Sequence, residues 1–247
     1  MRLRILLILF CLFTVQAHAK VNINDYTPPS LAELTEFSAN FNIFKLNDQA
    51  AFKEYLNIAD CPLAASLKDS PFKLREEQSK VIAAFKEKNT DLKMLYYRLP
   101  VTLKVSGYNF DTQSLPVIVE SQFKKVNSLE LTPARTMLCN QEDTYNFTKI
   151  PGYYVMKLNF PISLYRVPMQ RDVAESFFNK LDFAREDGLI RLIYGYMYVQ
   201  VETIQPQVQT DDLVPKIMMR GQVNMINLYL DRKRTLLFKT LDYSENF

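Results

Sequence analysis

The sequence predicts an α+β fold in which N-terminal helices pack against a mostly antiparallel β-sheet within a single domain. Apolar residues recur at helical spacing from residue 30 to about 88. After residue 92 the spacing changes to two, in short runs rich in β-branched and aromatic residues. The run Leu189 to Val201 is apolar on both alternating faces, which is typical of a central strand covered by helices on one side.

The chain begins with the features of a cleaved signal peptide over residues 1–19. Two arginines precede an apolar run that closes on Ala17-His18-Ala19, the small-x-small pattern that signal peptidases read. The apolar run is shorter than the roughly 20 residues that a transmembrane helix needs. We therefore expect cleavage after Ala19, a periplasmic or secreted protein, and no transmembrane segment in the mature chain, residues 20–247.

Loss of this segment removes the only histidine of the chain, His18. Without histidine the usual serine-hydrolase triad, a histidine general base and the common catalytic zinc sites are excluded. The five glycines of the chain form neither a phosphate-binding loop nor a dinucleotide fingerprint. We therefore expect no cofactor and no metal, and the sequence favours a role without catalysis.

The charge balance predicts no nucleic-acid partner. The 30 Lys and Arg residues nearly equal the 27 Asp and Glu residues, and two of the basic residues lie in the expected signal peptide. Nucleic-acid binding needs a basic face that neutralises phosphates. We expect the partner to be a protein or another component of the cell envelope.

Three helices are expected in the first part of the domain, residues 30–90. The first begins with Ser30 as its N-cap, with a glutamate three residues later as in a capping box. The second carries apolar residues spaced by three and four and is expected to stop at Pro62. The third has Pro71 in its first turn, where proline is tolerated, and ends near residue 89.

The rest of the domain, residues 91–241, is expected to be mainly β-structure with one helix. The strands cover about 94–105, 115–122, 130–138, 153–166, 189–204, 217–230 and 235–241, and the helix lies at about 169–182. Polar residues 231–234 predict a hairpin tip. Arg232, Lys233 and Arg234 could bind an anionic surface, but a solvated tip is favoured. Gly195 predicts a bulge or a close approach of two backbones.

Two cysteines, Cys61 and Cys139, remain after loss of the signal peptide. An even pair in an oxidising compartment predicts a disulfide bond between them. The bond would close a long loop and would contribute on the order of 4 kcal/mol to stability. Two buried thiols without a bond are the alternative.

Short aromatic and proline motifs mark the middle of the chain. They are Glu54-Tyr-Leu-Asn-Ile-Ala-Asp-Cys61, Asp69-Ser-Pro-Phe72, and Tyr108-Asn-Phe-Asp111 followed by Leu115-Pro-Val117. Over about residues 50–120 the chain resembles a family of bacterial exported proteins known only as a domain of unknown function. The resemblance implies a bacterial, envelope-facing setting and carries no activity, ligand or catalytic residue.

Tyr194, Tyr196 and Tyr198 form the candidate binding surface, because a period of two places them on one face of a strand. Such a row can stack against a sugar or a peptide. The same pattern is also typical of tyrosines in a core or on a half-buried sheet, so both interpretations stay open.

The alternative function is a carboxylate-dependent hydrolase that acts on envelope polysaccharide. Its candidate acids are adjacent pairs, namely Glu142 and Asp143, Glu186 and Asp187, and Asp211 and Asp212. A glycosidase needs two carboxyl groups roughly 5 to 9.5 Å apart across the sugar, whereas acidic pairs beside turns are usually solvated. The sequence therefore favours a soluble, non-catalytic binding module of the cell envelope.

Overall fold

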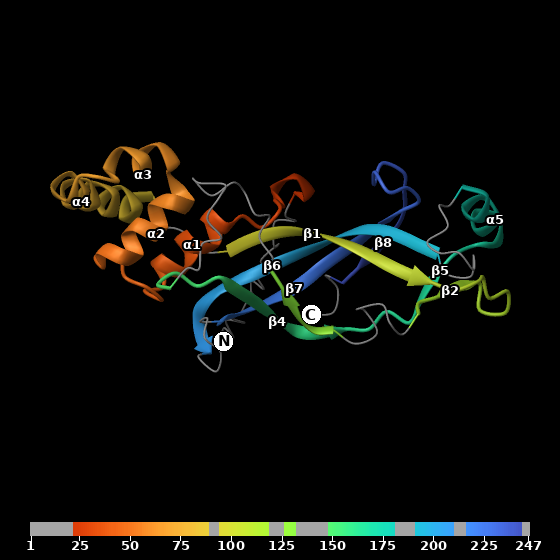
Figure 1. Cartoon of the computed structure of the whole chain (residues 1–247). Coiled ribbons are helices and arrows are strands. Elements are labelled where there is room, and N and C mark those ends of the chain that lie inside the picture. The colour runs from red at the N-terminus through yellow and green to blue at the C-terminus, as the bar shows by residue number, and fades with distance from the viewer. Residues whose placement is uncertain are drawn as a thin grey trace, which may run out of the picture.

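The computed structural model describes residues 22–88, 94–118, 126–131, 148–180, 191–209 and 216–243. Within these ranges a six-stranded sheet lies in the middle of the molecule, with helices gathered at its two ends (Figure 1). The α+β class predicted from the sequence is confirmed. The expected signal peptide lies outside the described residues.

Four α-helices follow one another at the N-terminal end, after the short 3-10 helix η1 (Ile23–Asp25). They are α1 (Leu31–Asn40), α2 (Gln49–Ala59), α3 (Cys61–Leu67) and α4 (Pro71–Lys88). Side-chain oxygens accept hydrogen bonds from N–H groups in the first turns of the first three α-helices, as unpaired donors at helix starts require. The acceptors are Ser30, Asp48 and Asp60.

Helix α3 corrects one expectation about this region. The second helix was expected to run to Cys61 and to stop at Pro62, but α2 ends at Ala59 and Pro62 lies in the first turn of α3. The side chain of Asp60 accepts a hydrogen bond from the Leu63 N–H at 3.0 Å and starts the new helix. Proline has no N–H to leave unpaired, so it suits this position.

The main sheet has the strand order β1-β6-β7-β4-β3, and β8 also pairs with β7. Its members are β1 (Met94–Val105), β3 (Val126–Glu130), β4 (Tyr153–Ile162), β6 (Arg191–Gln209), β7 (Lys216–Tyr229) and β8 (Leu237–Asp242). β6 lies between β1 and β7 and is antiparallel to both, which confirms its predicted central position. β7 is parallel to β4 and antiparallel to β8, so the sheet is mixed.

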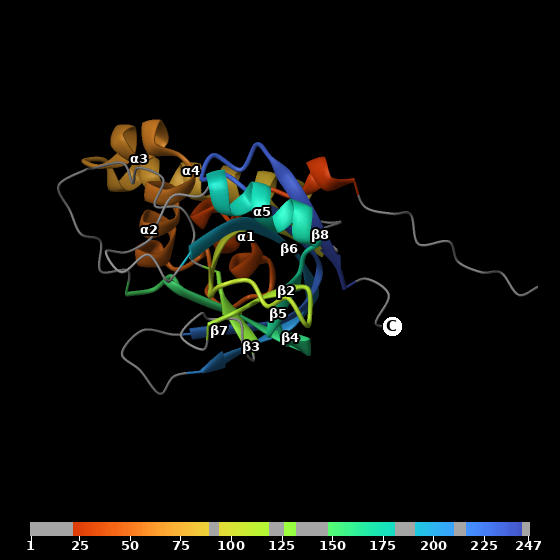
Figure 2. The ribbon, with the colours of Figure 1, turned by 90° about the vertical axis from the view of Figure 1, so that its right-hand side faces the viewer.

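The second half of the chain also forms a small sheet and a helix at the far end of the molecule. β2 (Ser114–Pro116) pairs with β5 (Arg166–Pro168), and α5 (Arg171–Lys180) follows. Figure 2 looks at this end and shows α5 beside β8, where the rings of Phe177 and Phe238 are 6.0 Å apart. The strands expected at 115–122 and 153–166 are therefore shorter than predicted. β3 precedes the strand expected at 130–138, most of which lies outside the described residues.

Two hydrophobic clusters hold these elements together. The main core joins α1 and α5 to one face of the sheet and includes the fully buried Phe37, Phe177, Ile193 and Met197. The second core lies among α2, α3 and α4 and also contains Ile150, from the segment that leads into β4. Helices therefore cover one face of the sheet, and the candidate site lies on the other.

Two glycines permit close contacts between neighbouring backbones in this sheet. A Cβ atom at Gly195 would lie 2.6 Å from the carbonyl oxygen of Asn227, and one at Gly221 would lie 2.4 Å from that of Gln200. Both distances are too short for a side chain. The close approach predicted at Gly195 is confirmed.

Candidate binding surface

Successive residues of β6 point to opposite faces of the sheet. Ile193 and Met197 are fully buried in the main core. Tyr194 and Tyr196 point to the opposite face and are half-buried there. The alternation predicted from the sequence thus places these two tyrosines away from α1 and α5.

The structure removes Tyr198 from the predicted binding row. Only 3% of this residue is exposed, because the ring of Tyr26 packs edge-on against it at 5.2 Å. Burial is the main reason why the pKa of Tyr198 is raised to about 12. Its ring therefore has a packing role, and the candidate surface is built around Tyr196.

Two guanidinium groups lie over the ring of Tyr196. The Cζ atom of Arg98 is 4.8 Å from the ring centroid and that of Arg234 is 4.9 Å from it. Both distances are within the range of cation–π attraction. The ring of Tyr229 packs edge-on against Tyr196 at 6.0 Å, and Arg234 also lies 5.8 Å from the ring of Tyr194. We call these five residues, Arg98, Tyr194, Tyr196, Tyr229 and Arg234, the aromatic–arginine surface.

Sheet register and one turn bring the two arginines to Tyr196. In the pairing of β1 with β6, Arg98 is the partner of Tyr198 and so shares its face. Arg234 lies in the loop between β7 and β8 with a φ of 58°, and its Nε donates to the Gly195 carbonyl at 3.0 Å. The expectation that Arg234 is solvated at the hairpin tip is therefore wrong, whereas Arg232 and Lys233 are exposed as predicted.

The positive charge of these arginines is not balanced by an acid in the part of the chain that the structure describes. Ion pairs on α4 and α5, such as Lys80 with Glu76, do not involve either arginine. Asp231, in the same loop as Arg234, accepts hydrogen bonds from Thr235 and Leu236 instead. The Nε of Arg98 is buried and has no hydrogen-bond partner among the described residues, which is costly for a donor.

The arrangement of the two arginines therefore favours the binding of an anion. Their distances to the Tyr196 ring place the guanidinium groups within about 10 Å of each other, which is roughly one Debye length at 0.1 M salt. Two positive charges at this separation repel each other. A carboxylate bound to either guanidinium group would reduce the repulsion and would accept hydrogen bonds in the geometry that guanidinium groups prefer.

Sequence reasoning did not single out Arg98 or Tyr229, and it favoured a solvated position for Arg234 over a role in binding an anionic surface. Arg98 lies between the apolar residues Tyr97 and Leu99 in β1, a pattern that indicates only that its side chain points away from the core. Its neighbour across the sheet depends on the register of β1 with β6, which the sequence does not specify. The fold of Arg234 back onto Gly195 depends on a left-handed backbone conformation, for which arginine gives no signal.

The remaining sequence-predicted candidates do not join this surface. Cys61 is half-buried at the start of α3, and its proposed partner Cys139 lies outside the described residues, so their bond stays a prediction. The three acidic pairs considered for a hydrolase also lie outside them. Two cavities found among the described residues, one at the start of α4 and one beside α5, have no acidic residue in their lining.

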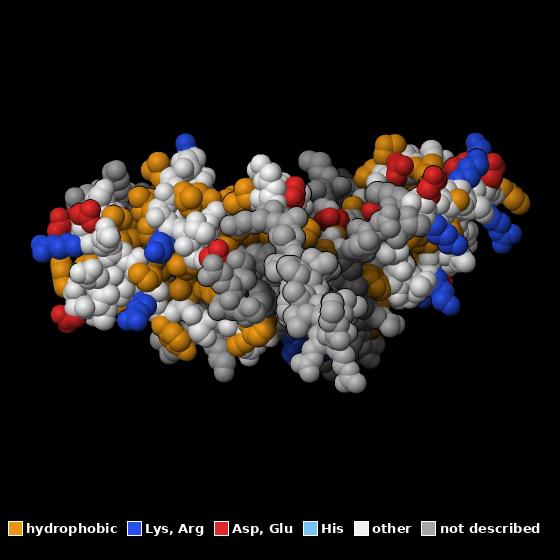
Figure 3. Space-filling model, turned by 180° about the vertical axis from the view of Figure 1, so that it is seen from behind, with side chains coloured by type: hydrophobic (Ala, Val, Ile, Leu, Met, Phe, Trp, Pro, Cys, Tyr) orange, Lys and Arg blue, Asp and Glu red, His pale blue; other side chains and the backbone are white. Residues whose placement is uncertain are grey.

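The described residues hold no group of three His, Cys, Asp or Glu side chains placed to bind a metal ion. Among the same residues, no helix has both the length and the apolar character to cross a membrane. Seen from behind (Figure 3), acidic and basic side chains are intermixed over the end that holds α2–α4. The face of this end that is seen in Figure 3 therefore does not carry a surface of one charge sign.

One family model matches the chain, over residues 47–180, and its description is Domain of unknown function (DUF4852). The match confirms the resemblance seen in the motifs of residues 50–120 and extends it to the end of α5. Comparisons with curated proteins and with solved structures gave no match.

Proposed function

The chain belongs to the family described as Domain of unknown function (DUF4852), and we propose that it is an exported, non-catalytic binding module of the bacterial cell envelope. It binds an acidic segment of a partner protein on the aromatic–arginine surface. The observation that supports this most is the pair Arg98 and Arg234, held over one tyrosine ring without an acidic partner in the described residues.

Export is supported by the sequence of residues 1–19, with its basic start, apolar run and small residues before Lys20. The test is the N-terminal sequence of the protein purified from its native host. We expect it to begin at Lys20. A native polypeptide that begins at Met1 would overturn the export half of the proposal.

An acidic protein segment fits the chemistry of the surface. Guanidinium groups bind carboxylates through two parallel hydrogen bonds, which fixes the position of the acid. Tyr194, Tyr196 and Tyr229 offer large, rigid rings with polar tips, the kind of contact area that protein interfaces use. An extended segment with acids and apolar residues would contact both kinds of group.

The proposal can be tested with a defined probe, a fluorescein-labelled peptide of ten glutamates. Anisotropy at low salt gives its affinity for the mature protein and for the single variants Arg98→Gln and Arg234→Gln. We expect each variant to bind about tenfold more weakly, which corresponds to about 1.4 kcal/mol, because each loses a charge-assisted hydrogen bond in a half-exposed site.

The matched control is Arg232→Gln. Arg232 lies in the same loop as Arg234 but is exposed, so this variant removes the same charge without touching Tyr196. We expect a change of less than twofold. If Arg232→Gln weakens binding as much as Arg98→Gln, the attraction is general electrostatics and the proposed surface is wrong. Absence of binding to the wild type rejects the proposal as well.

The ring of Tyr196 is tested separately. Tyr196→Phe keeps the ring over which both arginines lie, so we expect affinity within about threefold of the wild type. Tyr196→Ala removes the ring, and we expect it to weaken binding as much as loss of one arginine. Equal affinities of the Ala and Phe variants would exclude the ring from the binding surface. Circular dichroism of each variant checks that it is folded.

A further inference from the structure

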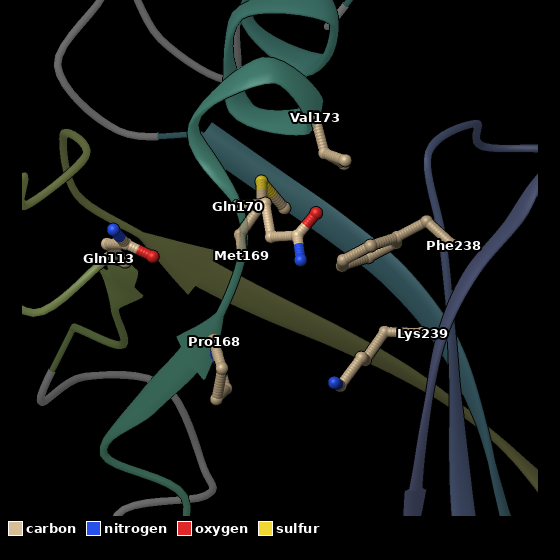
Figure 4. Close-up of a pocket in the computed structure, with 7 residues that line it drawn as sticks. All are labelled: Gln113, Pro168, Met169, Gln170, Val173, Phe238 and Lys239. Carbon is tan, nitrogen blue, oxygen red and sulfur yellow. The ribbon is translucent and has the colours of Figure 1, made fainter.

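A concave site lies on the face of the sheet that the helices cover, opposite the aromatic–arginine surface, because Lys239 pairs with Leu228 and Leu228 pairs with Gly195. A cavity of about 330 Å³, partly open to solvent, is lined by three segments that are distant in sequence (Figure 4). These are Gln113 from the turn before β2, residues 168–173 where β5 leads into α5, and Phe238 with Lys239 on β8. Its size is at the lower end of the range of small-molecule pockets.

Hydrogen bonds and ring packing fix the walls of this cavity. Gln113 adopts a left-handed conformation, with a φ of 43°, and its carbonyl accepts from the Met169 N–H at 3.0 Å. The hydroxyl of Tyr108 donates to the Met169 carbonyl at 2.9 Å. Phe238 packs against Phe177 of α5. The cavity is therefore preformed, which lowers the entropy cost of binding.

The lining separates into a polar part and an apolar part. The ammonium group of Lys239 and the amides of Gln113 and Gln170 face the cavity in Figure 4. No hydrogen bond or ion pair of these three side chains occurs among the described residues. Met169, Val173 and Phe238 supply an apolar wall. A single positive charge, two amides and an apolar wall match a molecule with one negative group and a short apolar body.

We propose that this cavity binds a small carboxylate with an apolar body, whose carboxylate contacts Lys239 and whose body contacts Val173 and Phe238. This site is separate from the aromatic–arginine surface. In the pairing of β7 with β8, Lys239 is the partner of Leu228, which is fully buried in the main core, whereas the neighbouring Tyr229 points to the opposite face. The inference therefore does not depend on the proposed function.

The test uses octanoate as the probe and 1-octanol as its uncharged counterpart. Isothermal titration calorimetry and backbone-amide NMR are carried out on the mature protein. We expect octanoate to bind at one saturable site and to shift the amide signals of residues 168–173, and we expect 1-octanol to bind at least fivefold more weakly. Failure of octanoate to saturate, or equal binding of the two probes, would overturn the proposal.

Variants locate the contacts. Lys239→Gln should weaken octanoate binding about tenfold, and Lys239→Arg, which keeps the charge, should stay within threefold of the wild type. Lys233→Gln is the matched control, since Lys233 is exposed at the tip of the same hairpin, and it should change binding less than twofold. Val173→Trp should fill the cavity and abolish binding while Lys239 keeps its charge. If Lys239→Gln or Val173→Trp binds octanoate like the wild type, the assigned cavity is wrong.

Discussion

Glu54 of α2 carries the most sharply defined stabilising contact between the helical end and the strands. One carboxylate oxygen accepts hydrogen bonds from the N–H and the hydroxyl of Thr148, and the other accepts from the N–H groups of Lys149 and Ile150, all at 2.9 to 3.0 Å. Ile150 is fully buried in the second core. The carboxylate therefore fastens the segment before β4 to the helices.

Replacement of Glu54 by Gln should destabilise the protein by about 2–3 kcal/mol. The amide oxygen can still serve two of the four donors, but the NH2 group faces the other two. Hydrogen bonds to a charged group contribute about 1.5–3 kcal/mol each, and we take the lower end because the Thr148 and Lys149 partners are exposed. In a domain of this length 1 kcal/mol corresponds to about 2–4 °C, so we expect the melting temperature to fall by about 5–10 °C.

Differential scanning calorimetry of the mature protein measures this fall. Lys53→Gln is the control, because Lys53 is the exposed neighbour in the same helix, and surface substitutions usually change stability by less than about 0.5 kcal/mol. Equal melting temperatures for the two variants would show that the four hydrogen bonds do not hold the segment, and the reasoning from the Glu54 contacts would be refuted.

Three further predictions concern packing, alkaline stability and the cysteines. Gly221→Ala should lower the free energy of unfolding in urea by about 1–3 kcal/mol, because its methyl group would meet a backbone carbonyl. Gly107→Ala, where the methyl group has open space, should change the free energy of unfolding little. Equal losses of stability in the two variants would contradict the packing argument. Burial raises the pKa of Tyr55 from 10.0 to about 12, so the neutral phenol stabilises the fold below pH 10 and this contribution is lost as pH rises through 12. Tyr55→Phe should reduce the loss of unfolding free energy between pH 10 and pH 12. An unchanged loss would argue against burial of Tyr55 as its cause. Mass spectrometry without reductant should find the Cys61 and Cys139 peptides joined by a disulfide bond. Free alkylation of both cysteines would contradict this prediction.

The sequence predicts a helix or strand of this fold best where one local pattern determines where that element begins and ends. β1 occupies the expected residues 94–105, and Pro71 begins α4 as its position in the first turn implies. Helix α3 was missed because Pro62 was taken only as a stop. A proline ends one helix and suits the first turn of the next equally well, and the cap at Asp60 decides between the two.

Long-range pairing could not be predicted in the same way. The parallel contact of β4 with β7 joins strands that are far apart in the chain, and an alternating pattern does not reveal the direction of a neighbouring strand. The contacts of the candidate surface could not be predicted from the sequence for the same reason. Tyr194 and Tyr196 follow from the period of β6, whereas Tyr229 comes from β7 through its register with β6. Arg98 reaches Tyr196 through the register of β1, and Arg234 reaches it through the path of a loop.

The most direct test of the binding surface is to watch the arginine side chains themselves. NMR spectra of the arginine Nε–H groups, recorded while the mature protein is titrated with the glutamate decapeptide, report contact at each guanidinium. We expect the signals of Arg98 and Arg234 to shift and saturate together while that of Arg232 stays in place. Stationary signals of Arg98 and Arg234, or equal shifts of all three arginines, would contradict the proposal that this surface binds acidic segments.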